Sequence, residues 1–151
     1  MIHGIIIARN LMDELEQRVI NHEGKRKSAY QDSLGYWTIG IGRLIDKRMN
    51  AGLSDDEMLY LLRNDLAESE RELMKFDWFT KMDRVRQEVL IELHFNIGLS
   101  NLLGFKNMIA YLSKGSYINA ATQLLKSLWA KQVGENRSSD MAKRLRTGSY
   151  T

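Results

Sequence analysis

Apolar residues recur every three or four positions through most of the chain from about residue 54 onward, and this spacing predicts amphipathic helices. The clearest stripe, within residues 54–76, is formed by Met58, Leu62, Leu66 and Leu73. Ser54 and Glu57 match a capping box, which places the start of that helix. Further helices are predicted, in chain order, over residues 83–98, 104–115, 116–132 and 138–148.

The pattern is different before residue 54. Residues 10–23 predict a first helix, with Asn10 as its N-terminal cap and Gly24 as its stop. Residues 28–32 and 36–42 instead predict two short strands joined by a tight turn.

Side chains of the second predicted strand are expected to alternate between two faces. The face directed toward a core would carry Trp37, Ile39 and Ile41, and the opposite face would carry Tyr36, Thr38, Gly40 and Gly42. Glycines inside a strand weaken it, and they often mark close approach by a ligand or another backbone.

These elements together predict an α+β fold that is mainly helical, in a single domain of residues 1–151. A small N-terminal lobe with a short β-hairpin or sheet is expected at about residues 20–53, followed by a connecting helix at about 54–76. The larger all-helical lobe would span about residues 77–151, together with the N-terminal helix 10–23. A cleft between two such lobes is a usual place for a ligand site.

Composition narrows the possible chemistry. The chain has a net charge of +3 and contains neither cysteine nor proline, so disulfides and thiolate metal sites are excluded. His3, His22 and His94 are not spaced as metal ligands, and we expect no metal and no cofactor. The small positive charge would suit an anionic polymer such as nucleic acid or a bacterial envelope, but it is more often a matter of solubility.

The N-terminal apolar run GIIIA is too short to span a bilayer and lacks the form of a signal peptide. We therefore expect no membrane segment, and a chain that stays in the cytosol where it is made unless another factor releases it. The segment GIGRLI matches only the start of a dinucleotide fingerprint, because Ile45 stands where the third glycine belongs. Nucleotide binding is therefore not expected.

Two acidic residues, Glu23 and Asp32, lie nine positions apart around the predicted helix end and turn. Glycoside hydrolysis needs one protonated carboxyl group and one ionised carboxylate. The negative end of a helix favours the protonated form of Glu23, and a more open turn favours the ionised form of Asp32. Acidic residues are also common at helix ends and before turns on protein surfaces, so the spacing alone leaves both interpretations open.

The segment HEG…Y.D..GYWTIGIG, from His22 to Gly42, resembles the active-site stretch of the phage-type lysozymes, the muramidases of T-even phages and their relatives. The segments FNIGLSNLLGF, LKSLWAKQ and RLRTG are similar to the C-terminal lobe of the same family, in the same order. The resemblance covers most of the chain, roughly from Leu15 to Tyr150. It implies a lysozyme-like fold.

The resemblance also implies roles for single residues. Glu23 would be the general acid, Asp32 the base that directs a water molecule, and Thr38 a residue that helps to hold that water. Members of this kind invert the anomeric centre, which requires carboxyl groups roughly 6.5–9.5 Å apart. Leu44 and Phe95 would line the sugar-binding cleft, and Arg137 would reach the acid Glu23 across it.

The implied function is that of an endolysin, which hydrolyses the β-1,4 bond between N-acetylmuramic acid and N-acetylglucosamine in peptidoglycan. Such a monomer would bind no nucleic acid and would wait in the host cytoplasm until a holin-type partner permeabilises the membrane. Between Arg43 and Asp83 the chain is about a third shorter than the T-even pattern, which bears on preferred substrate length. The alternatives are a lytic transglycosylase acting on the same bond and a non-catalytic basic protein that binds cell wall or nucleic acid.

Overall fold

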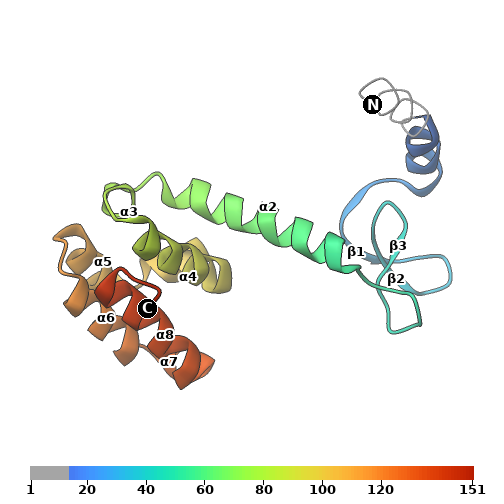
Figure 1. The fold of residues 1–151 in the computed structure, drawn as a ribbon. Coiled ribbons are helices and arrows are strands. Elements are labelled where there is room, and N and C mark those ends of the chain that lie inside the picture. Colours follow the sequence, from blue (N-terminus) through green and yellow to red (C-terminus); the bar gives the residue numbers. More distant parts are fainter. Residues whose placement is uncertain (1–13) are drawn as a thin grey trace. The chain divides into compact units, whose positions relative to one another are not determined.

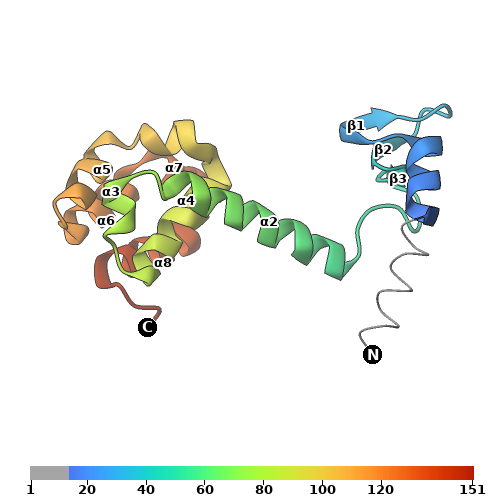
Figure 2. The ribbon, with the colours of Figure 1, turned by 90° about the horizontal axis from the view of Figure 1, so that it is seen from above.

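The computed structural model describes residues 14–151 and separates into two compact units (Figures 1 and 2). We call the described residues 14–58 the small unit and Leu59–Thr151 the helical unit. The predicted cap Asn10 and the start of the predicted helix 10–23 lie outside the described residues. The mainly helical α+β fold with a small antiparallel sheet is confirmed.

The small unit contains a helix over residues 14–23 and an antiparallel sheet in the order β1-β2-β3. Its strands are β1 (Arg26–Gln31), β2 (Trp37–Gly40) and β3 (Arg43–Leu44). The predicted hairpin is therefore confirmed, with the first strand beginning two residues earlier than expected. The short strand β3 was not predicted.

The predicted faces of the second strand are wrong. Thr38 is 3% exposed, whereas Trp37 is 50% and Ile41 is 42% exposed. Thr38 lies at the centre of the sheet, where Tyr30 of β1 and Leu44 of β3 pair with it on either side. Ile41 follows the end of β2, so the alternation of a strand no longer applies to it.

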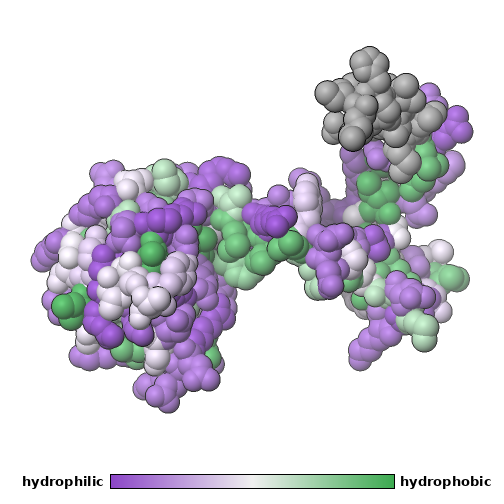
Figure 3. Space-filling model, viewed as in Figure 1, coloured by the Kyte–Doolittle hydropathy of each residue, from purple (hydrophilic) through white to green (hydrophobic). Residues whose placement is uncertain are grey.

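Helix α2 (Asp55–Leu73) begins in the small unit and continues into the helical unit. Its predicted capping box is present, because the backbone N–H of Glu57 donates to Ser54 Oγ at 3.2 Å and the N–H of Ser54 donates to Glu57 Oε1 at 3.0 Å. Of its predicted apolar stripe, Leu73 is fully buried in the core and Leu66 packs against it. Figure 3 shows apolar side chains gathered along this helix. Its exposed large hydrophobic residues are Met58, Leu59, Tyr60, Leu61 and Leu62.

In the helical unit, the predicted helices occur in the predicted order, and one short helix that was not predicted lies between the first two. The helices after α2 are α3 (Asp77–Thr80), α4 (Arg84–Leu103), α5 (Lys106–Ser113), α6 (Tyr117–Lys126), α7 (Leu128–Val133) and α8 (Glu135–Thr147). Asp83 caps α4, as the predicted start at that residue requires, by accepting from the N–H of Arg86 at 3.1 Å.

Several boundaries differ from the prediction: α8, for example, begins three residues earlier than expected, and two further differences have a clear local cause. Gly98 breaks α4 locally with φ 80° and ψ 167°, but the chain returns to helix and ends only at Leu103. The single helix predicted over residues 116–132 divides at Ser127, whose hydroxyl oxygen accepts from the N–H of Ala130 and so begins α7. Serine commonly begins a helix in this way, because its side chain satisfies an unpaired backbone donor.

The core of the helical unit is a cluster of buried apolar side chains that extends from the end of α2 to α8. Its largest fully buried members are Phe79, Leu73, Leu90, Leu93, Leu102, Met108, Leu112, Leu124, Met141, Leu145 and Val89. A buried polar group ties α2 to α4 within this unit: His94 lies 2.9 Å from Ser69 Oγ through Nδ1 and 2.5 Å from Glu72 Oε2 through Nε2.

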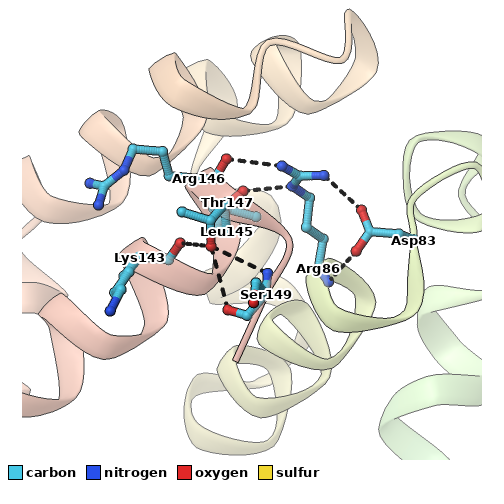
Figure 4. Close-up of polar contacts among 7 residues, drawn as sticks. All are labelled: Asp83, Arg86, Lys143, Leu145, Arg146, Thr147 and Ser149. Atoms are coloured by element: carbon cyan, nitrogen blue, oxygen red, sulfur yellow. Dashed lines mark hydrogen bonds and ion pairs between the residues drawn. The ribbon is translucent and has the colours of Figure 1, made fainter. Parts of the chain in front are cut away.

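The end of α8 is held by one arginine of α4 (Figure 4). Arg86 donates from Nε to the carbonyl oxygen of Leu145 at 2.7 Å and from Nη2 to that of Arg146 at 2.9 Å. Its remaining Nη1 binds Asp83 at 2.8 Å. The guanidinium group thus satisfies carbonyl groups that the end of a helix leaves unpaired.

Candidate active site

Glu23 lies in the last turn of the helix over residues 14–23. The next residue, Gly24, has φ +76° and donates its N–H to the carbonyl oxygen of Ile20 at 2.7 Å, which ends the helix. The Glu23 carboxyl group lies against Gly42: a Cβ atom at residue 42 would come within 2.9 Å of Glu23 Cδ and Oε2. Glycine at this position therefore leaves the space that the carboxyl group occupies.

Asp32 begins the turn that connects β1 to β2. Its Oδ1 accepts hydrogen bonds from the backbone N–H groups of Leu34, at 2.9 Å, and of Tyr36, at 2.8 Å. No hydrogen bond to its second oxygen, Oδ2, is found within residues 14–151. The carboxylate is therefore fixed through one oxygen, and the other can accept a hydrogen bond from water.

Thr38 lies in β2, shortly after this turn, and it shares a hydrogen-bond partner with Asp32. Its Oγ1 donates to the carbonyl oxygen of Tyr36 at 3.0 Å, and the N–H of Asp32 donates to the same oxygen at 2.9 Å. The hydroxyl oxygen of Thr38 keeps its acceptor lone pairs while it donates. The backbone of Tyr36 thus holds Asp32 and Thr38 in one arrangement.

Leu44, predicted to line the cleft, lies beside Thr38 in the sheet and is half-buried. Its carbonyl oxygen accepts from the N–H of Gly52 at 2.9 Å, which fixes the loop after β3. The small unit therefore contains four of the six predicted site residues, namely Glu23, Asp32, Thr38 and Leu44.

Phe95 and Arg137, the other two predicted residues, belong to the helical unit. Phe95 lies on α4 and is 45% exposed, and its contact with substrate stays a prediction. Arg137 lies on α8, with its Nε 3.7 Å from Glu92 Oε1. The contact of Arg137 with Glu23 stays a prediction.

Sequence reasoning missed a cluster of side chains around Tyr36. The Arg48 guanidinium carbon lies 3.1 Å from the centre of the Tyr36 ring, and Arg48 Nε donates to Asp46 Oδ1 at 2.9 Å. That hydrogen bond lowers the pKa of Asp46 below its ordinary value and raises the pKa of Arg48. An aspartate two residues before an arginine in a loop is a recognisable turn signal, but nothing in the spacing indicates that the arginine stacks on Tyr36.

The described part of the chain offers neither a cluster of metal ligands nor a membrane-spanning helix. Residues 14–151 contain no cluster of three or more histidine, cysteine, aspartate or glutamate side chains that could hold a metal ion. None of the helices described in this range is long and apolar enough to cross a bilayer.

The mainly helical α+β architecture with a small three-stranded antiparallel sheet agrees with a lysozyme-like fold. The family model described as phage lysozyme matches residues 20–148. The chain therefore belongs to the phage lysozyme family.

Curated relatives agree with this assignment. The chain is 25% identical to a probable T4-type lysozyme 1 of Dictyostelium discoideum, over 84% of this chain and 90% of that protein. It is 26% identical to an endolysin of Acyrthosiphon pisum secondary endosymbiont phage 1, over 73% of each chain. It is also 28% identical to the pre-baseplate central spike protein Gp5 of Enterobacteria phage T4, of which it spans only 26%. Family and relatives together support a peptidoglycan-lytic enzyme of the lysozyme type.

Proposed function

We propose that this protein hydrolyses the β-1,4 bond between N-acetylmuramic acid and N-acetylglucosamine in peptidoglycan, with inversion of the anomeric centre. The observation that carries the proposal is the arrangement around β2. Asp32 is held at the start of this strand, Thr38 lies within it, and the Glu23 carboxyl group packs against Gly42 just beyond its end. The proposed base is thus hydrogen-bonded to the residue before β2, and the proposed acid packs against the backbone just after it, so that one short strand lies between the two contacts. Catalysis by two carboxyl groups requires such fixed positions.

In the proposed reaction, Glu23 donates its proton to the oxygen that leaves the anomeric carbon. A water molecule, held by Asp32 Oδ2 and the Thr38 hydroxyl group, attacks that carbon from the opposite face of the sugar and passes its proton to Asp32. Because Tyr36 binds the other carboxylate oxygen of Asp32, Oδ2 is the oxygen left to take up this proton.

The remaining predicted residues would act around these three. Leu44 and Phe95 would contact the sugar rings, and Arg137 would support Glu23. We infer that the protein acts as a monomer on peptidoglycan and binds no nucleic acid.

As an endolysin, the protein would stay in the host cytoplasm until a holin-type partner opens the membrane. The endolysin among its relatives supports this role. The resemblance to part of a baseplate spike protein favours a second candidate, in which the same hydrolysis serves phage entry.

The direct test replaces each carboxyl group by its amide. Glu23→Gln and Asp32→Asn should each lower the rate of clearing of a peptidoglycan suspension by at least about a hundredfold, since positioned general acids and bases contribute about 10²–10⁴-fold. Both variants should keep the circular dichroism spectrum of the wild type. Glu16→Gln, which neutralises an exposed acid on the same helix as Glu23, should clear at the wild-type rate.

The outcome also separates the alternative functions. If Glu23→Gln cleared peptidoglycan as fast as the wild type, Glu23 could not be the general acid. A non-catalytic binding protein is distinguished in the same experiment, because its binding to wall polymer would be the same with glutamate or glutamine at position 23. Mass spectrometry of the products separates hydrolysis, which adds one water molecule, from transglycosylation, which forms an anhydro sugar. Proton NMR of the first product formed would show the α-anomer if the reaction inverts a β-linkage.

A further inference from the structure

Tyr36 occupies a central place in the candidate site, although it is not one of the reacting groups. Its N–H donates to Asp32 Oδ1 at 2.8 Å, and its carbonyl oxygen accepts from the N–H of Asp32 at 2.9 Å and from Thr38 Oγ1 at 3.0 Å. A rotation of the Tyr36 peptide units would therefore displace the proposed base and the proposed water ligand together.

The Tyr36 ring lies outside this hydrogen-bonded network and is 37% exposed. What covers it is the guanidinium group of Arg48, with its central carbon 3.1 Å from the ring centre. A guanidinium group in this position is attracted by the negative face of the ring, and its planar shape allows close stacking.

Arg48 is itself held in place. Its Nε and its backbone N–H both donate to Asp46 Oδ1, at 2.9 and 3.1 Å. This double contact fixes the loop after β3 and directs the guanidinium group over the ring. The hydrogen bond to Asp46 is the main cause that raises the pKa of Arg48, and the negative charge of Asp32 adds a smaller contribution in the same direction, which agrees with an arginine that lies near the proposed base.

We propose that Arg48 is a positioning residue of the active site: stacked on Tyr36 and anchored by Asp46, it holds the turn that presents Asp32 and Thr38 to the reacting water. This inference rests on the proposed function and extends it to a residue for which the resemblance implies no role. Arg48 acts through Tyr36, so its loss should lower turnover and leave substrate binding nearly unchanged.

The first test does not depend on activity. Hydrogen exchange measured by NMR reports how often the Tyr36 N–H leaves Asp32 Oδ1. In Arg48→Ala, exchange at Tyr36 should become about tenfold faster, because a stacked cation contributes on the order of one tenfold factor to local stability. Exchange at Gly24, whose N–H is bonded within the helix, should not change.

The second test divides kcat from KM. Arg48→Ala should lower kcat about tenfold with little change in KM, as expected when a group that acts only on the reacting geometry is disturbed. Tyr36→Leu should have the same effect, and Tyr36→Phe, which keeps the ring, should retain wild-type turnover. The double variant of Arg48→Ala and Tyr36→Leu should be no slower than either single one. Lys47→Ala, which removes the neighbouring positive charge, should leave both constants unchanged.

Three results would overturn the proposal. One is unchanged exchange at Tyr36 in Arg48→Ala; another is a raised KM with unchanged kcat, which would make Arg48 a direct substrate contact. The third is equal behaviour of Arg48→Ala and Lys47→Ala, which would reduce the effect to net charge. If Asp32→Asn proved fully active, the proposed function would fail, but the exchange experiment would still decide whether Arg48 holds this turn.

Discussion

Different interactions stabilise the interior of each of the two units. In the helical unit, a large cluster of apolar side chains is shielded from water, and several of its members have no exposed surface. In the small unit, over residues 14–58, Thr38 is the one buried residue, and it is polar. The small unit instead depends on backbone hydrogen bonds, carboxylates that cap turns, and ion pairs such as Arg43 with Glu57.

This difference matters for function, because burial and hydrogen bonds constrain a structure differently. Hydrophobic stabilisation grows with the buried area and has no preferred direction. Hydrogen bonds of the kind that hold Asp32 fix both distance and angle, although each contributes only about 1 kcal/mol net. The proposed base Asp32 therefore lies where geometry is well defined and where small changes should affect activity more than folding.

The largest effect on stability should come from the core of the helical unit. Phe79→Ala removes a fully buried ring, and we expect it to lower the free energy of unfolding by about 3–5 kcal/mol. Urea titration followed by circular dichroism measures this loss. Trp37→Ala, which removes a half-exposed ring of the small unit, should cost much less. Equal losses for the two variants would contradict the comparison.

A smaller loss is expected at the polar clamp of the helical unit. Arg86→Ala leaves the carbonyl groups of Leu145 and Arg146 without their charged donor, and we expect a cost of about 1.5–3 kcal/mol. Arg71→Ala removes a mostly exposed arginine that pairs with Glu68, and it should cost at most about 1 kcal/mol. If the two variants melted at the same temperature, the Arg86 contacts would contribute nothing beyond a surface pair.

The features that could be predicted from sequence are those that depend on neighbouring residues. Helix periods, the Ser54–Glu57 capping box and the Asp83 cap are local, and the structure confirms them. The turn at Asp32 was also predictable, because aspartate and glycine stand in turn positions. Strand β3 was missed because its two residues, Arg43 and Leu44, gain strand geometry only by pairing with β2.

The candidate site shows the same division. The positions of Glu23, Asp32 and Thr38 followed from a family resemblance, which carries information that spacing alone does not. The place of Tyr36 at the centre of the site depends on three hydrogen bonds and a stacking contact, and one of these partners lies twelve residues away in a loop. Such a contact has no periodic signal.

In the small unit, the next prediction separates activity from stability. Gly42→Ala places a methyl group 2.9 Å from the Glu23 carboxyl group at a residue with φ +70°, so it combines backbone strain with displacement of the proposed acid. Gly52→Ala is the matched control, because Gly52 has φ +95° and no atom within 4 Å of the added carbon. Both should lose about 1–2 kcal/mol of stability through the backbone.

Only Gly42→Ala should also lose activity. We expect its clearing rate, corrected for the folded fraction, to fall at least about tenfold, since small misplacements of catalytic groups are costly. Gly52→Ala should clear at nearly the wild-type rate under the same correction. Equal clearing by the two variants would mean that the position of the Glu23 carboxyl group against Gly42 is unimportant for catalysis.

The smallest effect concerns pH and the helical unit. Burial by itself would raise the pKa of Asp83, but the N–H and guanidinium groups of Arg86 outweigh it and hold this pKa below the ordinary value of 3.8. A carboxyl group whose pKa is lower in the folded state contributes stability above its unfolded pKa, and that contribution is lost as pH falls through the folded value. Melting temperature should therefore fall more steeply below about pH 4 in the wild type than in Asp83→Asn. The control is Asp65→Asn, which changes an exposed acid of α2 and should follow the wild-type curve. If Asp83→Asn showed the same slope as the wild type, the Asp83 cap would not contribute to acid sensitivity.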